Sequence, residues 1–318
     1  MTIDSDHDDA FDAALAARIS WHYFKEGQTQ EAIAGHLGLT RKRVNRMLAE
    51  ARERGLVQIT IQPPLGARSE LEARLVRQFG LRQAIVVPAP IGDTDVRVMV
   101  GAAAGAYVSD HLAPGAALGI GWGGTINSAA QNIRRRSGQG NRVVLLCGGL
   151  AESTSINPYD NASMMARALD ARCYYITAPM FAPTAELREA MTASEPIKSV
   201  LAMVPKLELA LLSAVDLTEQ SKALEYGVIS RNDWRSLRAA GSVGDICGHY
   251  LGIDGNPVEH PLIARMVHPA MKSLLAIPLR VLAAGGLAKV AIIRAAIKAK
   301  LCHVLITDES AAAALLDS

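Results

Sequence analysis

The stretch TQEAIAGHLGLTRKRVNRML, residues 29–48, decides the fold of the N-terminal part of the chain. Gly38 divides it into two segments in which apolar residues recur at three- and four-residue steps, a spacing typical of amphipathic helices. Thr29 and Thr40 each precede one segment, where a hydroxyl can accept a hydrogen bond from the free N–H groups of a helix start. We therefore predict two short helices joined by a tight turn. Their apolar faces are Ile33, Ala34 and Leu37 in the first, and Val44, Met47, Leu48 and Ala51 in the second.

The sequence on both sides extends this pattern. Residues 14–24 carry an apolar residue at every fourth position and end before Gly27, which predicts a preceding helix. Residues 56–61 alternate in polarity, which predicts a strand, and Pro63-Pro64 follows it. Three helices, a tight turn before the third and then a strand are typical of a winged helix-turn-helix domain. We assign residues 13–62 to this domain, after an acidic tail at residues 1–12 that we expect to be disordered.

Basic residues concentrate on the third predicted helix. From Arg41 to Arg54 the chain has six basic residues and two glutamates, a local charge of +4 in a chain of net charge +2. A helix fits the major groove of DNA, where arginine recognises guanine and asparagine recognises adenine. We therefore expect double-stranded DNA as a partner. The candidate contact residues are Thr29, Gln30, Thr40, Arg41, Lys42, Arg43, Asn45 and Arg46. The alternative is a three-helix bundle with a solvated basic face.

Composition excludes several other classes of protein. The chain has 318 residues, of which 50% are hydrophobic and 20% charged, enough to bury a large core. Its four cysteines lie far apart with no CxxC pair, which argues against a zinc finger and a disulfide scaffold. The acidic start does not fit a signal peptide, and no apolar run approaches the roughly 20 residues of a membrane span. We expect a cytoplasmic protein with no membrane partner, metal or cofactor.

From residue 84 onward the pattern changes to that of an α/β domain. Residues 63–80 first form an amphipathic helix, which we interpret as a linker. Short apolar runs then alternate with helical stretches, which is typical of a mainly parallel sheet with helices on both faces. We predict this second domain at residues 81–318, with strands at 84–87, 117–120, 143–146, 174–178, 207–214, 277–282 and 302–307.

Two glycine-rich loops follow predicted strands, where open α/β sheets bind their ligands. Residues 119–125, GIGWGGT, lead into a helix that we expect to end near residue 135, and residues 284–289, AGGLAK, lead into another. Glycines let the backbone approach an anion, and the helix start supplies free N–H groups. Thr125 adds a hydroxyl. Lys289 lies in the first turn of its helix, where the helix dipole disfavours a cation unless an anion binds there.

Carboxylate side chains also occur in a predicted turn and at the end of the last predicted strand. Residues 244–248, GDICG, read as a glycine-flanked turn that carries Asp245. Asp308 and Glu309 end the last predicted strand and either accept hydrogen bonds from hydroxyls or cap the last helix. Loops that bind anions, together with hydrogen-bond acceptors, indicate a phosphorylated polyhydroxy ligand.

At this point the chain resembles the SorC family of sugar-responsive bacterial transcriptional regulators. The matching segments are TQEAIAGHLGLTRKRVNRML, GWGGT, GDICG, AGGLAK and VLITDESAAAALL, and they span almost the whole chain in the family's order. The resemblance implies an effector domain related to glucosamine-6-phosphate deaminases and ribose-5-phosphate isomerases. It also implies a sugar, polyol or sugar-phosphate effector and a dimer or tetramer on operator DNA.

The resemblance also assigns candidate effector contacts by position. It implies a phosphate cradle at Gly121, Gly123, Gly124, Thr125 and Lys289, a contact from Asp245 to the sugar, and Asn161 near the pocket. One position departs from the family. Where members often have a polar or basic residue before Gly148-Gly149, this chain has Cys147, so the effector is either phosphorylated or a smaller, unphosphorylated polyol or ketose.

The competing hypothesis is an isomerase or deaminase acting on sugar phosphates. Such an enzyme needs a positioned acid and base, and Asp308, Glu309 and His303 are the clustered candidates in the sequence. A buried structural role is the simpler interpretation of His303, and catalysis alone does not need a DNA-binding module. An RNA-binding sensor fits less well, because no aromatic residues interrupt the basic helix.

Overall fold

The computed structural model describes residues 12–57, 68–92 and 94–317. The chain divides into two compact units, residues 1–63 and 64–318. The expected acidic tail lies outside the described residues except for Asp12, whose carboxylate caps the first helix by accepting from the N–H groups of Ala14 and Leu15.

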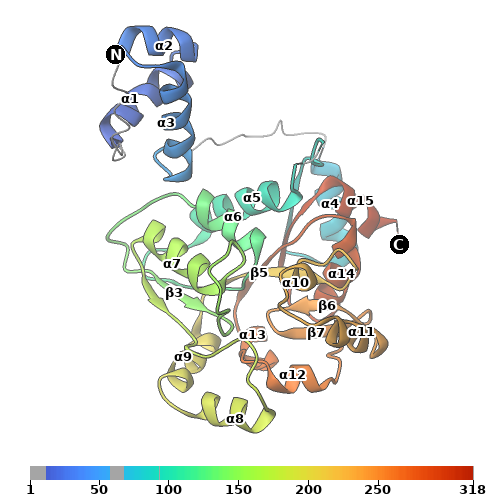
Figure 1. Cartoon of the computed structure of the whole chain (residues 1–318). Helices are drawn as coiled ribbons and strands as arrows, with labels where there is room; N and C mark the ends of the chain where they lie inside the picture. Colours follow the sequence, from blue (N-terminus) through green and yellow to red (C-terminus); the bar gives the residue numbers. More distant parts are fainter. Residues whose placement is uncertain (1–11, 58–67, 93, 318) are drawn as a thin grey trace. The chain divides into compact units, whose positions relative to one another are not determined.

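The first unit contains three short helices, α1 (Ala13–Phe24), α2 (Gln30–Leu37) and α3 (Arg41–Glu53), drawn in blue in Figure 1. The hydroxyls of Thr29 and Thr40 accept hydrogen bonds from the N–H groups of Ala32 and Arg43, each at 3.2 Å, which confirms both predicted caps. Gly38 ends α2 in the left-handed region at φ +64°. The core confirms the predicted apolar faces except that Leu37 is only partly buried: Ala16, Ile19, Ile33, Ala34, Val44, Met47, Leu48 and Ala51 are buried.

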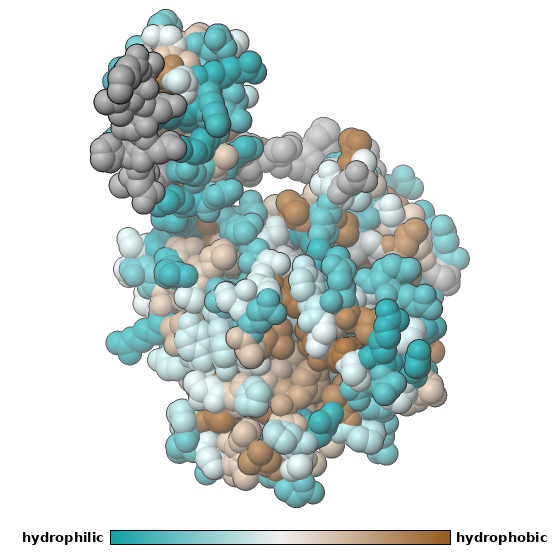
Figure 2. Space-filling model, viewed as in Figure 1, coloured by the Kyte–Doolittle hydropathy of each residue, from teal (hydrophilic) through white to brown (hydrophobic). Residues whose placement is uncertain are grey.

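The winged part of the prediction is not tested, because residues 58–61 of the expected strand lie outside the described residues. The helix-turn-helix itself is formed as the sequence predicts. On the face shown in Figure 2, the surface of this unit is largely hydrophilic.

The second unit is built on a parallel sheet, as predicted. Its strand order is β1-β9-β8-β5-β2-β3-β4, and all six neighbouring pairs are parallel. The strands are β1 (Gln83–Val87), β2 (Ala117–Ile120), β3 (Arg142–Leu145), β4 (Arg172–Tyr174), β5 (Leu209–Asp216), β8 (Leu279–Ala283) and β9 (Val304–Asp308). The carboxyl ends of the adjacent strands β2, β5 and β8 therefore meet at one edge.

Helices cover both faces of this sheet, because alternate strand residues point to opposite sides. In β5, Leu209 and Leu211 belong to one core and Ala210 and Leu212 to the other. The first core includes α5 (Val96–His111), α6 (Gly124–Asn132), α7 (Pro158–Leu169) and α11 (Arg231–Ala239). The second includes α4 (Ser69–Phe79), α9 (Ile197–Met203), α13 (Met271–Leu275), α14 (Val290–Lys298) and α15 (Glu309–Leu316). Smaller elements are α8 (Ala185–Ala193), α10 (Lys222–Glu225), α12 (Pro261–Arg265) and the 3₁₀ turns η1 (Val204–Lys206) and η2 (Leu287–Lys289).

One strand pair was missed by the sequence analysis. The predicted turn at residues 244–248 is wrong, since residues 242–246 form β6 (Ser242–Ile246), which pairs antiparallel with β5 and with β7 (His249–Gly252). Only Cys247 and Gly248, with φ of +51° and +90°, make the turn. Close packing favours glycine at position 244, because a Cβ there would lie 2.4 Å from the carbonyl oxygen of Val215.

Further boundaries differ from the predictions, and β5, β8 and β9 each begin two residues later than expected. β4 ends at Tyr174, where its pairing with β3 ends, rather than at residue 178. α6 ends at Asn132, and Lys289 closes η2 rather than lying inside α14. The helix predicted as a linker, α4, packs on β1 and α15, with Leu75 fully buried. Within the described residues, no helix is long and apolar enough to cross a membrane.

Candidate functional site

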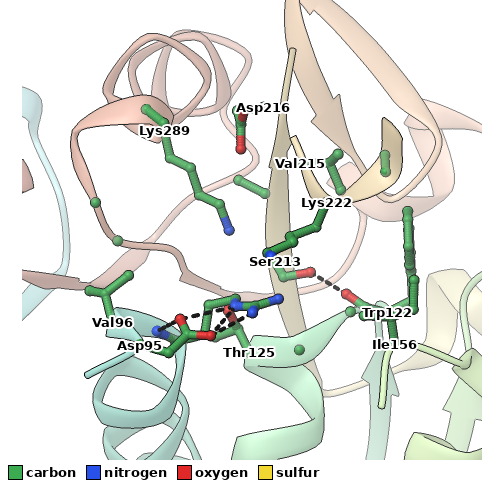
Figure 3. Close-up of a pocket in the computed structure, with 18 of the residues that line it drawn as sticks. Asp95, Val96, Trp122, Thr125, Ile156, Ser213, Val215, Asp216, Lys222 and Lys289 are labelled. Atoms are coloured by element: carbon green, nitrogen blue, oxygen red, sulfur yellow. Dashed lines mark hydrogen bonds and ion pairs between the residues drawn. The ribbon is translucent and has the colours of Figure 1, made fainter. Parts of the chain in front are cut away.

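A pocket of about 230 Å³ lies at the carboxyl ends of β2, β5 and β8. Figure 3 shows its side chains, most of which come from five separate parts of the second unit. They are the start of α5, the β2–α6 loop, the end of β5, the start of α10 and the β8–α14 loop. Ile156, before α7, adds an apolar contact. This is the edge at which the sequence predicted a ligand.

The first predicted loop contributes its backbone to this pocket. Gly123, Gly124 and Thr125 line it, and Gly123 begins α6 in a glycine-only conformation at φ +103°. Gly121 does not line the pocket, because its N–H pairs with Leu211 in β5. Asn161 is fully buried behind the loop, where its Nδ2 donates to the carbonyl of Gly123 at 3.3 Å. Asn161 therefore holds the loop without lining the pocket.

The second predicted loop forms the opposite wall. Gly285, Gly286 and Lys289 line the pocket, and the Lys289 side chain extends into it (Figure 3). Burial lowers the pKa of the Lys289 ammonium, while the nearby Asp216 carboxylate raises it and Arg97 lowers it. The ammonium is therefore held among charges of both signs rather than in a purely cationic site.

Five polar residues of the pocket were missed by the sequence analysis. They are Asp95, Arg97, Ser213, Asp216 and Lys222. Arg97 binds Asp95 through Nε, at 3.0 and 2.8 Å from its two carboxylate oxygens. Partial burial alone would raise the pKa of Asp95, but hydrogen bonds from Arg97 hold it below its usual value. Asp216 ends the central strand β5 and Ser213 lies three residues before it, so the strand-end rule used for the loops could have found both.

Asp245 and Cys147 do not line the pocket, although Asp245 pairs in the sheet with the lining residue Val215. Asp245 is 1% exposed in the middle of β6, and it is not among the residues that line the pocket. Cys147 is fully buried after β3 and also does not line the pocket. A contact of Asp245 with a sugar therefore stays a prediction.

The three residues considered for catalysis do not form one site. His303 precedes β9 and Asp308 ends it, so the strand separates them by roughly 15 Å. His303 instead pairs with Arg280, at 2.9 Å between Nε2 and Nη2. Asp308 caps α15, as one of the two interpretations predicted, and Glu309 forms an ion pair with Arg68.

A second candidate site is the polar face of α3. Arg41, Lys42, Asn45 and Arg46 are exposed there. Arg43, also a candidate contact, is half-buried because it precedes the buried Met47 by one helical turn. Gln30, at the start of α2, donates to the Asn45 side-chain oxygen at 3.4 Å. The first turn of α3 and the Gln30–Asn45 pair are therefore both available to contact DNA.

Known proteins resemble this chain over nearly its full length. Residues 64–317 match the family model described as "Putative sugar-binding domain". The erythritol catabolism regulatory protein EryD of Brucella abortus is 32% identical over 309 residues, which are 96% of this chain and 97% of that protein. The chain belongs to the SorC family of sugar-binding transcriptional regulators.

Other members agree with this assignment. The transcriptional regulator LsrR of Escherichia coli K12 is 31% identical over 95% of this chain and 94% of that protein. The crystal structure of the full-length sorbitol operon regulator SorC from Klebsiella pneumoniae shares the fold, with a TM-score of 0.74 over 96% of this chain and 100% of that one, at 24% identity. As a SorC-family member the chain is a transcriptional regulator and not an isomerase or deaminase.

Proposed function

We propose that this SorC-family regulator binds operator DNA through α3 and that a small polyhydroxylated effector in the pocket controls this binding. The observation that carries the proposal is the pairing of an exposed basic helix-turn-helix face with a pocket at the carboxyl ends of β2, β5 and β8. Effector binding changes DNA affinity only when the two states of the protein bind the effector with different free energies.

The charges of the pocket favour an uncharged polyol over a phosphorylated sugar. Each cation that lines it has a carboxylate companion: Arg97 pairs with Asp95, Lys222 pairs with Glu225, and Lys289 interacts with Asp216. A polyol can use both the donors and the acceptors of such a site, whereas the two lining carboxylates offset most of the attraction of the lining cations for a phosphate. The volume is also small, below the roughly 300–1,000 Å³ of common ligand pockets.

A thermal-shift experiment tests this effector class. Erythritol is the first probe, since the related EryD is named for erythritol catabolism. We expect it to raise the melting temperature, because a ligand at 100 times its Kd stabilises the native state by about 2.7 kcal/mol. Lys289→Ala is expected to abolish the shift, while Lys272→Ala, an exposed lysine of α13 outside the pocket lining, leaves it unchanged.

Charge variants separate the two effector classes. Asp216→Asn removes the carboxylate beside Lys289 and is expected to weaken polyol binding while strengthening binding of inorganic phosphate. A shift of the wild-type protein by a sugar phosphate and by no free polyol contradicts the neutral-effector assignment. The DNA-binding assignment is unaffected by that outcome.

A DNA-binding measurement tests the role of α3. Arg46→Ala is expected to weaken binding to a fragment upstream of the chain's own gene by about 1–3 kcal/mol if Arg46 contacts a base. Arg52→Ala removes the same charge from the far end of α3 and serves as the control. Fluorescence anisotropy at two salt concentrations separates base contacts from phosphate contacts. If both variants lose the same affinity for specific and random DNA, Arg46 does not read sequence.

The proposal includes self-association and a cytoplasmic location. Helix-turn-helix proteins commonly bind two half-sites about one helical turn apart as dimers, so two or four copies of this chain on one operator are expected. Analytical ultracentrifugation with and without the DNA fragment measures that number. Repression and activation are both compatible with this arrangement.

A further inference from the structure

Two consecutive carboxylates, Asp308 and Glu309, join the pocket to the start of α4. The Asp308 carboxylate accepts a hydrogen bond from the N–H of Gly286, in the pocket loop, at 2.6 Å. The next side chain, Glu309, accepts from Nε of Arg68 at 2.7 Å. The pocket loop and Arg68 are therefore connected through adjacent residues of one helix start.

The contact on the pocket side is tight. Asp308 is 1% exposed, and a Cβ at Gly285 would lie 2.7 Å from its Oδ1. Its other oxygen accepts from the N–H groups of Ser310 and Ala311 at the first turn of α15. Because close-packed groups move together, a rearrangement of the loop around a ligand also moves the start of α15.

Glu309 also contacts the segment that precedes α5. Its second oxygen accepts from the N–H of Ala89 at 3.0 Å, in the segment between β1 and α5. α5 begins with the pocket residues Asp95, Val96 and Arg97. Arg68 and the N–H of Ala89 together hold the pKa of Glu309 below its usual value, against the effect of burial. The carboxylate is thus ionised and bound to both neighbours.

Arg68 occupies a connecting position in the chain. It is the N-cap residue of α4 and the first described residue after 58–67, which lead from the helix-turn-helix unit. Its side chain is 20% exposed and that of Glu309 35%, so the pair is partly shielded from water. The rest of α4 is fixed separately, because Glu72 accepts from the N–H of Val86 in β1. Arg68 can therefore change partner without releasing the helix.

From these contacts we propose that Arg68 and Glu309 are coupling residues, whose ion pair transmits the state of the effector pocket to the segment that leads to the DNA-binding unit. The pair is the two-state element, formed with one arrangement of the Gly285-Gly286 loop and broken with the other. This inference rests on the proposed function. It assigns to Glu309 a role in signal transmission rather than in effector binding, since Glu309 does not line the pocket.

DNA affinity of the full chain without effector tests the proposal directly. Coupling free energies between sites typically correspond to roughly 5–150-fold changes in affinity. Arg68→Gln and Glu309→Gln are each expected to change the Kd for the upstream DNA fragment by at least about fivefold, in the same direction. The double variant is expected to change it no further, because residues that act as one pair are not additive. Arg68→Lys keeps the positive charge but loses the planar guanidinium group. Its Kd for the DNA fragment is expected to lie between those of wild type and Arg68→Gln.

A surface pair provides the control. Arg134→Gln breaks an exposed ion pair with Asp110 that does not touch the pocket loop, and its DNA affinity should equal that of the wild type. Circular dichroism verifies that each variant is folded. DNA affinities of Arg68→Gln, Arg68→Lys and Glu309→Gln within twofold of wild type would overturn the coupling role and leave the regulator function intact. Absence of DNA binding by the wild type overturns both.

Discussion

Asp245→Asn is expected to stabilise the protein most above neutral pH and much less in mild acid. The Asp245 carboxyl is 1% exposed, and its Oδ1 has no hydrogen-bond partner among the described residues. Burial raises its pKa to about 7, although the N–H of Gly248 opposes this. An unfolded chain loses this proton near pH 3.9, so the difference of about 3 units corresponds to about 4 kcal/mol.

The direction of this pH dependence follows from the number of protons that the native and unfolded states bind. Between about pH 4 and pH 7 the native state keeps a proton that the unfolded chain has lost, so the stability contributed by Asp245 falls as the pH rises through this window. Asparagine has the same shape and no charge to desolvate. Urea unfolding at about pH 5 and about pH 8 measures the effect, with the exposed Glu219→Gln as control. Equal pH dependence of Asp245→Asn and wild type would show that Asp245 is ionised in the native state, as a residue in contact with solvent or ligand would be.

The helix-turn-helix could be predicted in detail because its determinants are local. Each cap lies three residues from the N–H group it accepts from, as in Thr29–Ala32 and Thr40–Arg43, and each apolar face repeats within two helical turns. The partial burial of Arg43, a candidate DNA contact, also has a local cause. A residue one turn before a buried methionine lies on the edge of the apolar face, which a binary pattern of polar and apolar residues does not show.

The second unit could be predicted only in part, because its details depend on distant pairs. Asp245 was placed in a turn since two glycines flank it, whereas its position in a strand depends on pairing with Val215, thirty residues earlier. The glycine-rich loops were correctly placed at the pocket. The carboxylates that balance their charge were not, because Asp95 and Asp216 meet Lys289 only after α5, β5 and the β8–α14 loop converge.

Because α5 takes part in this convergence, a small change within α5 is expected to disturb the pocket. Gly101 lies where α5 crosses α6, and a Cβ there would be 2.4 Å from Cβ of Ser128 and 2.6 Å from the carbonyl oxygen of Thr125. Real Cβ atoms do not approach backbone oxygens this closely, so α6 must move. Overpacking of this kind costs typically 1–3 kcal/mol.

Gly101→Ala is therefore expected to lower the free energy of unfolding by about 2 kcal/mol, although alanine favours a helix by about 1 kcal/mol over glycine. Gly35→Ala is the matched control, since Gly35 is exposed in α2 with open space around it, and it should stabilise its own unit. Urea unfolding measures both. Because α6 begins with the pocket residues Gly124 and Thr125, Gly101→Ala should also reduce the thermal shift caused by the effector. A stability gain at both glycines would mean that α5 and α6 are not in close contact at Gly101, and the pocket loop would then be held by its hydrogen bonds to Asn161 and Ser213 instead.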